Sequence, residues 1–251
     1  MNSLVILLLT ANAAFQAPVA EVAPQSPRAI AEKNPNLTDE VRGDIMMARK
    51  MYRDAIDFYR PSSNKNAVMA NKTGIAYHQL GDLENAKKYY ERAIKLDKLY
   101  PEAHNNLGTV QYAKKSYGNA IKSYEKALAL TPEAAPVWTN LGTAYFARKK
   151  YPEALRAYQY ALQIDPEVFE RRGSNGVMLQ ERSVEEKGMF YYTLAKSYAQ
   201  AGDEERMLRY VRFALENGFK QRSRFLEEPE FAAFKENVQL KELLAAEQNV
   251  L

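Results

Sequence analysis

The sequence predicts an all-α fold in which helical hairpins stack into a solenoid. Asn-Leu-Gly-Thr occurs at residues 106–109 and again at 140–143, which is 34 residues later. Each 34-residue unit also contains two stretches with helical hydrophobic spacing, joined by a short turn. Hydrophobic residues form 46% and charged residues 26% of the 251-residue chain, as in an ordinary folded soluble protein.

Three consecutive units, residues 67–100, 101–134 and 135–168, place similar residues at the same offsets. In the third unit these are Trp138, Leu141, Gly142, Tyr145, Ala154, Tyr158, Ala161 and Pro166. In the second unit they are His104, Leu107, Gly108, Gln111, Ala120, Tyr124, Ala127 and Pro132. In the first unit they are Ala70, Thr73, Gly74, Tyr77, Ala86, Tyr90, Ala93 and Lys98. Agreement across three windows indicates a true repeat.

The repeated residues are those that two packed helices need. Small residues such as Gly108 and Ala120 let the two backbones approach closely, and Leu107 with Tyr124 fills the space beside them. Pro132 stands where the second helix must end. A single hairpin cannot bury its apolar face, so neighbouring hairpins are expected to stack.

Two further units are degenerate. Residues 38–66 carry Gly43, Ala55 and Tyr59 at the expected offsets, before Arg60-Pro61 cuts the second helix short. Residues 188–221 carry Leu194, Ala195, Tyr198, Gly202 and Ala214, but Met207 and Val211 replace the expected Ala and Tyr, which predicts different packing. Residues 222–251 have helical spacing of another kind and are predicted to cap the end of the stack.

This pattern resembles the tetratricopeptide repeat family, whose motif is W-x2-L-G-x2-Y, A-x3-F, P. The unit 135–168 matches each motif position, with Tyr158 in place of Phe. The resemblance extends over roughly residues 38–221. It implies a right-handed solenoid whose concave groove, lined by the first helix of each unit, binds a protein or an extended peptide.

The groove-facing offsets that the resemblance implies carry mostly polar residues that can donate and accept hydrogen bonds. The candidate groove residues are Asn71, Lys72, Asn105, Asn106, Thr109, Tyr112, Thr139, Asn140, Thr143 and Phe146. The repeat region of the O-linked N-acetylglucosamine transferases uses a ladder of asparagines to hold peptide backbone. Asn106 and Asn140 match that ladder, whereas Lys72 breaks it. The alternative is that these residues are ordinary polar surface.

Other family members hold a C-terminal carboxylate with a Lys and Asn clamp. The offsets of that clamp carry Asn71 with Ile75, Asn105 with Thr109, and Thr139 with Thr143, which disfavours this function. Basic residues recur at the turns, as Arg49-Lys50, Lys114-Lys115 and Arg148-Lys149-Lys150. Their position at helix C-termini, where cations are favoured, explains them better than an acidic partner or a membrane surface does.

Residues 169–187 are an insertion, and Gly173-Ser174-Asn175-Gly176 marks a loop within it. The favoured interpretation is a tolerated surface loop. The alternative is a flap over the groove that carries Arg171, Arg172 and Arg182.

The N-terminus predicts export. Residues Leu4–Leu9 are apolar, and Ala11 and Ala13 fit a small-x-small cleavage site, so residues 1–13 are predicted to be a signal peptide. The apolar run is too short to span a membrane. Residues 14–37, rich in Pro and Ala, are predicted to be a flexible linker. The absence of cysteine excludes disulfides, thiolate metal sites and a lipidated N-terminal Cys.

The sequence offers little support for other function classes. The net charge is +4, with both signs mixed along the chain, and no nucleic-acid-binding module is evident. Catalytic motifs are absent, and no cofactor or metal site is predicted. His104 replaces the Trp of the repeat and is expected to be packed and hydrogen-bonded, while His78 has a groove-facing offset without a second metal ligand.

The sequence therefore predicts a non-catalytic, exported scaffold, periplasmic or secreted, that binds a protein or an extended peptide. Three alternatives remain open at this stage. The first is a structural subunit of a cell-envelope assembly that contacts partners through its insertion and cap. The second is a cytoplasmic regulator with a misread start. The third is a cryptic hydrolase or transferase.

Overall fold

The computed structural model describes residues 26–33, 35–170 and 184–246. Every regular element among these residues is helical, which confirms the all-α prediction. The elements are α1 (Pro27–Lys33), α2 (Asp39–Ala48), α3 (Tyr52–Tyr59), α4 (Ala67–Gln79), α5 (Leu83–Leu96), α6 (Pro101–Ala113), α7 (Tyr117–Leu130), α8 (Ala135–Ala147), α9 (Tyr151–Ile164), α11 (Val184–Ala201), α12 (Glu204–Glu216), α13 (Arg224–Glu227), the 3-10 helix η1 (Pro229–Phe234) and α14 (Val238–Ala245).

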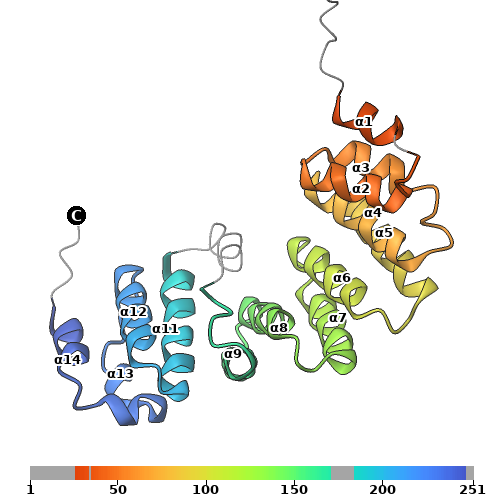
Figure 1. Ribbon diagram of the computed structural model, residues 1–251. Coiled ribbons are helices and arrows are strands. Elements are labelled where there is room, and N and C mark those ends of the chain that lie inside the picture. Colours follow the sequence, from red (N-terminus) through yellow and green to blue (C-terminus); the bar gives the residue numbers. More distant parts are fainter. Residues whose placement is uncertain (1–25, 34, 171–183, 247–251) are drawn as a thin grey trace, which may run out of the picture.

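Consecutive helices pair into hairpins, and each hairpin packs against the next. The pairs are α2–α3, α4–α5, α6–α7, α8–α9 and α11–α12, and the contacts α3–α4, α5–α6, α7–α8 and α9–α11 join them into one stack. In Figure 1 the stack follows an arc from α2 to α12. The first helices α4, α6 and α8 also contact one another in sequence, which places them on the inner side of the curve. The predicted solenoid is therefore confirmed.

Each of the first four hairpins is closed by a glycine that lies against a tyrosine ring. The pairs are Gly43–Tyr59, Gly74–Tyr90, Gly108–Tyr124 and Gly142–Tyr158. A Cβ atom added at Gly142 would lie only 2.4 Å from Cε1 of Tyr158, and real Cβ atoms do not approach so closely. All four tyrosine side chains are buried. Only glycine therefore lets the first helix rest on the ring carried by the second.

The hairpin α11–α12 solves the same packing problem with different residues. Ala195 takes the offset of the glycine and Val211 the offset of the tyrosine, and both are fully buried. Because valine is much smaller than tyrosine, it leaves room for the extra methyl group of Ala195. The sequence-based prediction of different packing in this unit has this physical explanation.

The turn between the two helices of a hairpin needs a residue with a positive φ angle. Gly81 and Gly202 adopt φ of 76° in two of these turns, whereas Lys50, Lys115 and Lys149 adopt 59°, 58° and 60°. Non-glycine residues enter this left-handed region at a cost of about 1–2 kcal/mol. The residue that follows satisfies a helix carbonyl, since Lys150 N donates to Tyr145 O at 3.0 Å. The basic turn residues thus lie at helix C-termini, as predicted.

The helices end where the sequence indicates. Helix α3 ends at Tyr59, immediately before Arg60-Pro61, and α7 ends at Leu130, two residues before Pro132. Several helices begin with a side-chain cap. Asn66 accepts a hydrogen bond from the backbone N–H of Met69 at 3.1 Å, and Asp82 accepts one from Asn85 at 3.0 Å.

The C-terminal helices cover the last hairpin. Phe225 of α13, Phe231 of η1 and Leu240 of α14 are fully buried in the cluster that contains Tyr192 of α11. The ring of Tyr192 lies 5.2 Å from that of Phe225. This arrangement confirms the predicted helical cap, which buries the apolar surface that the end of the stack would otherwise expose.

The predicted linker and insertion need correction at their edges. Helix α1 occupies residues 27–33, within the range predicted as linker, and Arg28 of α1 pairs with Asp54 of α3 at 2.5 Å. Phe169, placed in the insertion, is buried against Tyr158 at a ring distance of 5.4 Å, and α11 begins at Val184. The predicted signal peptide and the predicted flap residues Arg171, Arg172 and Arg182 lie outside the described residues.

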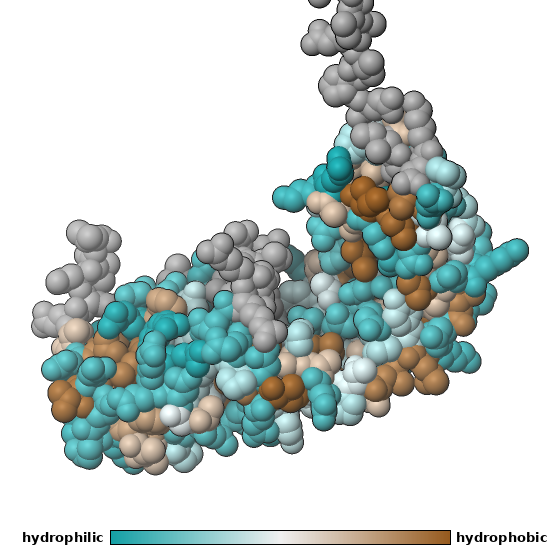
Figure 2. All heavy atoms as spheres, viewed as in Figure 1, coloured by the Kyte–Doolittle hydropathy of each residue, from teal (hydrophilic) through white to brown (hydrophobic). Residues whose placement is uncertain are grey.

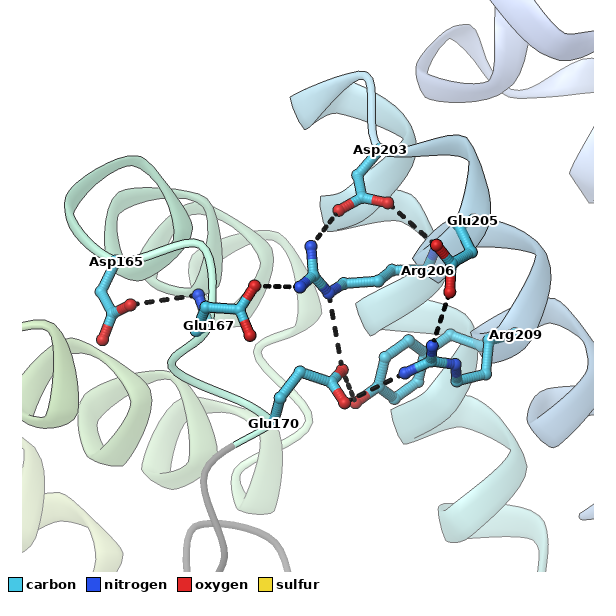
Figure 3. A network of polar contacts seen from close by, with 8 residues as sticks. Asp165, Glu167, Glu170, Asp203, Glu205, Arg206 and Arg209 are labelled. Carbon is cyan, nitrogen blue, oxygen red and sulfur yellow. Dashed lines mark hydrogen bonds and ion pairs between the residues drawn. The ribbon is translucent and has the colours of Figure 1, made fainter.

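A network of ion pairs joins the segment after α9 to α12 (Figure 3). Arg206 contacts Asp203 at 2.5 Å and also pairs with Glu167. Arg209 donates to Glu170 at 3.0 Å. This network holds the chain close to α12 on the N-terminal side of residues 171–183.

Among the described helices, none combines the length and the apolar character needed to cross a bilayer.

We predict that Gly142→Ala destabilises the protein by about 2–4 kcal/mol, because the new methyl group collides with the ring of Tyr158. In a protein that already carries Tyr158→Val, Gly142→Ala should lower the free energy of unfolding by about 1–3 kcal/mol less than it does in the wild type. The two changes together recreate the pair Ala195–Val211. Urea unfolding of the wild type, both single variants and the double variant, followed by circular dichroism, measures this coupling.

Gly118→Ala is the matched control, because a Cβ at Gly118 would meet only Arg148 Nη1 at an ordinary 3.7 Å. This variant should be as stable as the wild type or slightly more stable. Strict additivity of the Gly142 and Tyr158 changes would contradict the packing explanation.

Candidate peptide-binding face

The candidate site lies on the side of α4, α6 and α8 that faces the inside of the arc, which we call the inner face. Successive first helices approach one another here, so side chains from neighbouring hairpins can meet. Residues three and four positions apart share one side of a helix. Asn71 and Lys72 of α4, Asn105 and Asn106 of α6, and Asn140 of α8 form a row along the stack, because side-chain hydrogen bonds join α4 to α6 and α6 to α8.

The asparagines in this row bond to one another. Asn106 Nδ2 donates to Asn71 Oδ1 at 3.0 Å, and Asn140 Nδ2 donates to Asn105 Oδ1 at 3.0 Å. Asn71 Nδ2 in turn donates to the hydroxyl of Tyr100 at 3.3 Å. Each of the two hydrogen bonds between asparagines ties one hairpin to the next, whereas a ladder of Asn106 and Asn140 that holds peptide backbone stays a prediction. We call these two hydrogen bonds the amide ladder.

Lys72 replaces the amide contact with an ionic one at the junction between α2 and α4. Its Nζ lies 2.7 Å from a carboxylate oxygen of Glu40 and 2.7 Å from one of Asp44. Burial alone would lower the pKa of Lys72, but the bonds to Asp44 and Glu40 outweigh it and raise that pKa above its usual value. Asp44 also accepts a hydrogen bond from the hydroxyl of Tyr59 at 2.6 Å.

Glu40 and Asp44 were not identified from the sequence, although a signal for Asp44 was present. Asp44 follows Gly43 as Thr109 follows Gly108 and Thr143 follows Gly142. Extending the groove offsets into the degenerate first unit would have placed Asp44 on the inner face. Its half-exposed carboxylate makes this end of the face more acidic than the centre.

Four of the ten predicted groove residues are buried: Asn71, Thr139, Thr143 and Phe146. The prediction that these side chains project into an open groove is wrong. Thr143 Oγ1 donates to the backbone carbonyl of Thr139 at 2.8 Å. The ring of Phe146 lies 5.6 Å from that of Phe190, which α11 contributes as the first helix of the next hairpin.

The other six predicted residues are partly exposed: Lys72, Asn105, Asn106, Thr109, Tyr112 and Asn140. Thr109 accepts a hydrogen bond from the buried Tyr124 hydroxyl at 3.4 Å, so it links the inner face to the hairpin core. The ring of Tyr112 packs 5.2 Å from that of Tyr117. Their role in binding a peptide stays a prediction.

The two histidines differ in their surroundings. His104 is buried, and its Nε2 lies 3.1 Å from the backbone carbonyl of Lys98, which confirms the predicted packed and hydrogen-bonded imidazole. His78 is partly buried near the end of α4, and burial lowers its pKa. At neutral pH His78 therefore presents an uncharged imidazole. In the described part of the chain, no three His, Asp or Glu side chains cluster as a metal site requires.

Comparison with known proteins identifies the repeat. Residues 71–135 and residues 135–168 match two family models, both of which describe the tetratricopeptide repeat. A search of curated proteins gave no match.

Among solved structures, a crystal structure of MamA is 21% identical with a TM-score of 0.51, and the match covers 70% of this chain and 93% of that one. MamA from Desulfovibrio magneticus RS-1, residue 41 to the end, is 18% identical with a TM-score of 0.51, over 78% of this chain and 98% of that one. At these identities the likeness is one of fold.

We predict that the two rungs of the amide ladder contribute unequally to stability. Asn106→Ala should cost about 1–3 kcal/mol, because it leaves the carbonyl oxygen of the buried Asn71 without its hydrogen bond. Asn140→Ala should cost less, about 0.5–1.5 kcal/mol, because its acceptor Asn105 is only half-buried and water can replace the lost donor. Urea unfolding of both variants gives the comparison.

The control is Asn119→Ala, on the exposed first turn of α7, where we expect a change below about 0.5 kcal/mol. Equal losses for Asn106→Ala and Asn140→Ala would show that burial of the acceptor does not set the strength of a rung.

Proposed function

We propose that this chain, whose residues 71–168 match the tetratricopeptide repeat, is a non-catalytic scaffold that holds an extended segment of a partner protein on its inner face. The amide ladder is the observation that supports this most directly. Two inter-hairpin hydrogen bonds of 3.0 Å keep the amides of Asn106 and Asn140 in place. Groups fixed in advance lose little conformational entropy when a partner binds.

The ladder asparagines keep hydrogen-bonding capacity for a ligand. Each side-chain amide has two N–H donors and a carbonyl oxygen, and the rung uses one N–H of Asn106 or Asn140. Both side chains are partly exposed. An extended peptide presents an N–H and a C=O at every residue, so these amides suit recognition of backbone with little dependence on sequence. Tyr112 would add apolar contact beside them.

The inner face is graded along its length. Its N-terminal end carries Glu40, Asp44 and Lys72, its centre carries the amides, and at its C-terminal end Phe146 is buried with its ring against Phe190 of α11. Figure 2 shows that hydrophilic residues cover most of the visible surface, while apolar residues gather over α2 and α3 at the right. The proposed segment would therefore occupy the stretch from α2 to α8, about four hairpins long.

Photo-crosslinking tests where the partner binds. Tyr112→p-benzoylphenylalanine places a reactive aromatic group on the inner face, and Val238→p-benzoylphenylalanine places one on the cap, where Val238 is 68% exposed. After irradiation in the native cell and affinity purification, mass spectrometry should find partner peptides joined to residue 112.

Adducts at residue 238 without adducts at residue 112 would instead favour an assembly subunit that contacts partners through its cap. A second arm repeats the capture with Asn106→Ala and Asn140→Ala combined, at a temperature where the variant is folded. Capture at the wild-type level would contradict a role for the ladder amides.

The proposal includes export, for which the support is the apolar run Leu4–Leu9 and the small residues Ala11 and Ala13. The purified cellular protein should begin after Ala13 when its N-terminus is determined by Edman sequencing. An intact Met1 would overturn export and leave a regulator that is not exported.

A further inference from the structure

A second concave feature lies on the outer side of the stack. It is an open pocket of about 420 Å³, lined by residues of α7, α8 and α9, and we call it the outer pocket. Trp138, Leu141 and Tyr145 line it from α8, three to four positions apart, and so share one side of that helix. The inner-face residue Asn140 lies on another side. The pocket therefore opens between the second helices of two consecutive hairpins.

The outer pocket exists because one side chain is small. In the hairpin α4–α5 the equivalent offsets hold Tyr77 and Tyr89, whose rings stack with their centres 5.4 Å apart. In α8–α9 these offsets hold Tyr145 and Ala157. The methyl group of Ala157 cannot fill the volume that the ring of Tyr89 occupies. The space is thus a local property of one hairpin rather than of the repeat.

The hairpin α6–α7, which lies between α4–α5 and α8–α9, closes the same position by a polar contact. Ser123 Oγ donates to Gln111 Oε1 at 2.8 Å, and these residues hold the offsets of Ala157 and Tyr145. The three hairpins therefore fill the position with stacked rings, with a hydrogen bond, and with nothing larger than a methyl group.

The walls of the outer pocket are aromatic and rigid. The rings of Trp138 and Tyr160 stack 4.9 Å apart, and Trp138 Nε1 donates to the carbonyl of Pro132 at 2.8 Å. Tyr160 is 51% exposed, so its ring is accessible to a partner at the edge of the pocket. Leu128 and Leu141 contribute aliphatic surface below the rings.

The charged residues that line the pocket are two carboxylates, Glu125 and Glu153, and one guanidinium, Arg156. The Tyr145 hydroxyl donates to Glu125 at 2.9 Å. Burial, together with this carboxylate, raises the pKa of Tyr145 to about 12, so the phenol stays protonated at neutral pH and can donate this hydrogen bond. Glu153 lies 3.5 Å from Lys150 in a solvent-screened pair. Lys150 Nζ also lies 6.0 Å from the ring centre of Tyr145, so Glu153 already has a cation beside it, and Glu125 is the carboxylate bonded to the aromatic wall.

We propose that the outer pocket binds a Lys or Arg side chain from a basic segment of a partner protein. The aliphatic stem of such a side chain matches the surface of Leu128, Leu141 and Ala157. Its cationic head would lie against the outward face of the stacked Trp138–Tyr160 pair, an arrangement that favours cations, and within reach of Glu125. An acidic or purely apolar residue would satisfy only part of this lining. The inference concerns a surface separate from the inner face and does not depend on it.

Trp138 is the single tryptophan of the chain, so intrinsic fluorescence reports directly on the pocket. The probe is the tryptophan-free peptide acetyl-Ala-Lys-Leu-Arg-Ala-amide, and its matched control is acetyl-Ala-Glu-Leu-Glu-Ala-amide. The basic peptide should change the Trp138 emission saturably at millimolar or lower concentration, and the acidic peptide should not.

Ala157→Tyr should fill the pocket as Tyr89 fills the equivalent position and weaken binding at least about tenfold, a change of about 1.4 kcal/mol. Ala157→Ser, the residue type found at Ser123, keeps the space and should bind like the wild type. If Ala157→Tyr does not fold, as judged by circular dichroism, Glu125→Gln combined with Glu153→Gln keeps the shape, removes both carboxylate charges and should weaken binding to a similar extent.

Three results would overturn the proposal. These are no saturable response to the basic peptide, equal responses to the two peptides, or wild-type binding by the Glu125→Gln, Glu153→Gln variant. Emission that depends on the protein's own concentration would also overturn it, since a second copy of the chain would then occupy the pocket. None of these results bears on crosslinking at the inner face, so the two proposals fail independently.

Discussion

The contact between a glycine and a tyrosine ring within each hairpin is the constraint on which the rest of the structure depends. Because no Cβ can fit between Gly142 and Tyr158, the first helix rests directly on the ring of the second. That close contact fixes which sides of the first helix face inward and outward. The hairpin α11–α12 supports this explanation within the same chain, since Ala195 occurs together with Val211. Compared with the other hairpins, α11–α12 carries one more methyl group on its first helix and no aromatic ring at this position of its second helix, and the two helices still pack together.

Curvature then gives the two sides of the stack different chemistry. On the inner side the first helices lie close together, and their side chains bond across each junction, through amides at Asn106 and Asn140 and through ions at Lys72. These contacts both stabilise the stack and hold polar groups in fixed positions. On the outer side the second helices are farther apart, so the space between them is filled or left open according to local side-chain volume. Ala157 leaves it open, and the walls of that space carry aromatic rings and carboxylates.

Most of the fold could be predicted from the sequence, because the spacing of small and aromatic residues is a local property of two adjoining helices. The hairpins, their ends near Pro61 and Pro132, and the cap all follow from it. The site could be predicted only in part. The offsets indicate the direction of a side chain from its own helix, which places Asn106 and Asn140 correctly in one row. They do not indicate what covers that side chain, so the burial of Phe146 against Phe190 of α11 and the bond from Asn106 to Asn71 were not foreseen.

The sequence by itself determined the repeat, the helix pairing and the residue types along each side of the stack, since these depend on periodicity and on contacts within about 34 residues. Only the tertiary structure decided which asparagines hydrogen-bond to each other, which threonines are buried, and where a pocket opens beside the stacked rings of Trp138 and Tyr160. Those outcomes depend on the distance between neighbouring hairpins and on the volume of side chains that meet across it. Both quantities arise only when the hairpins are stacked.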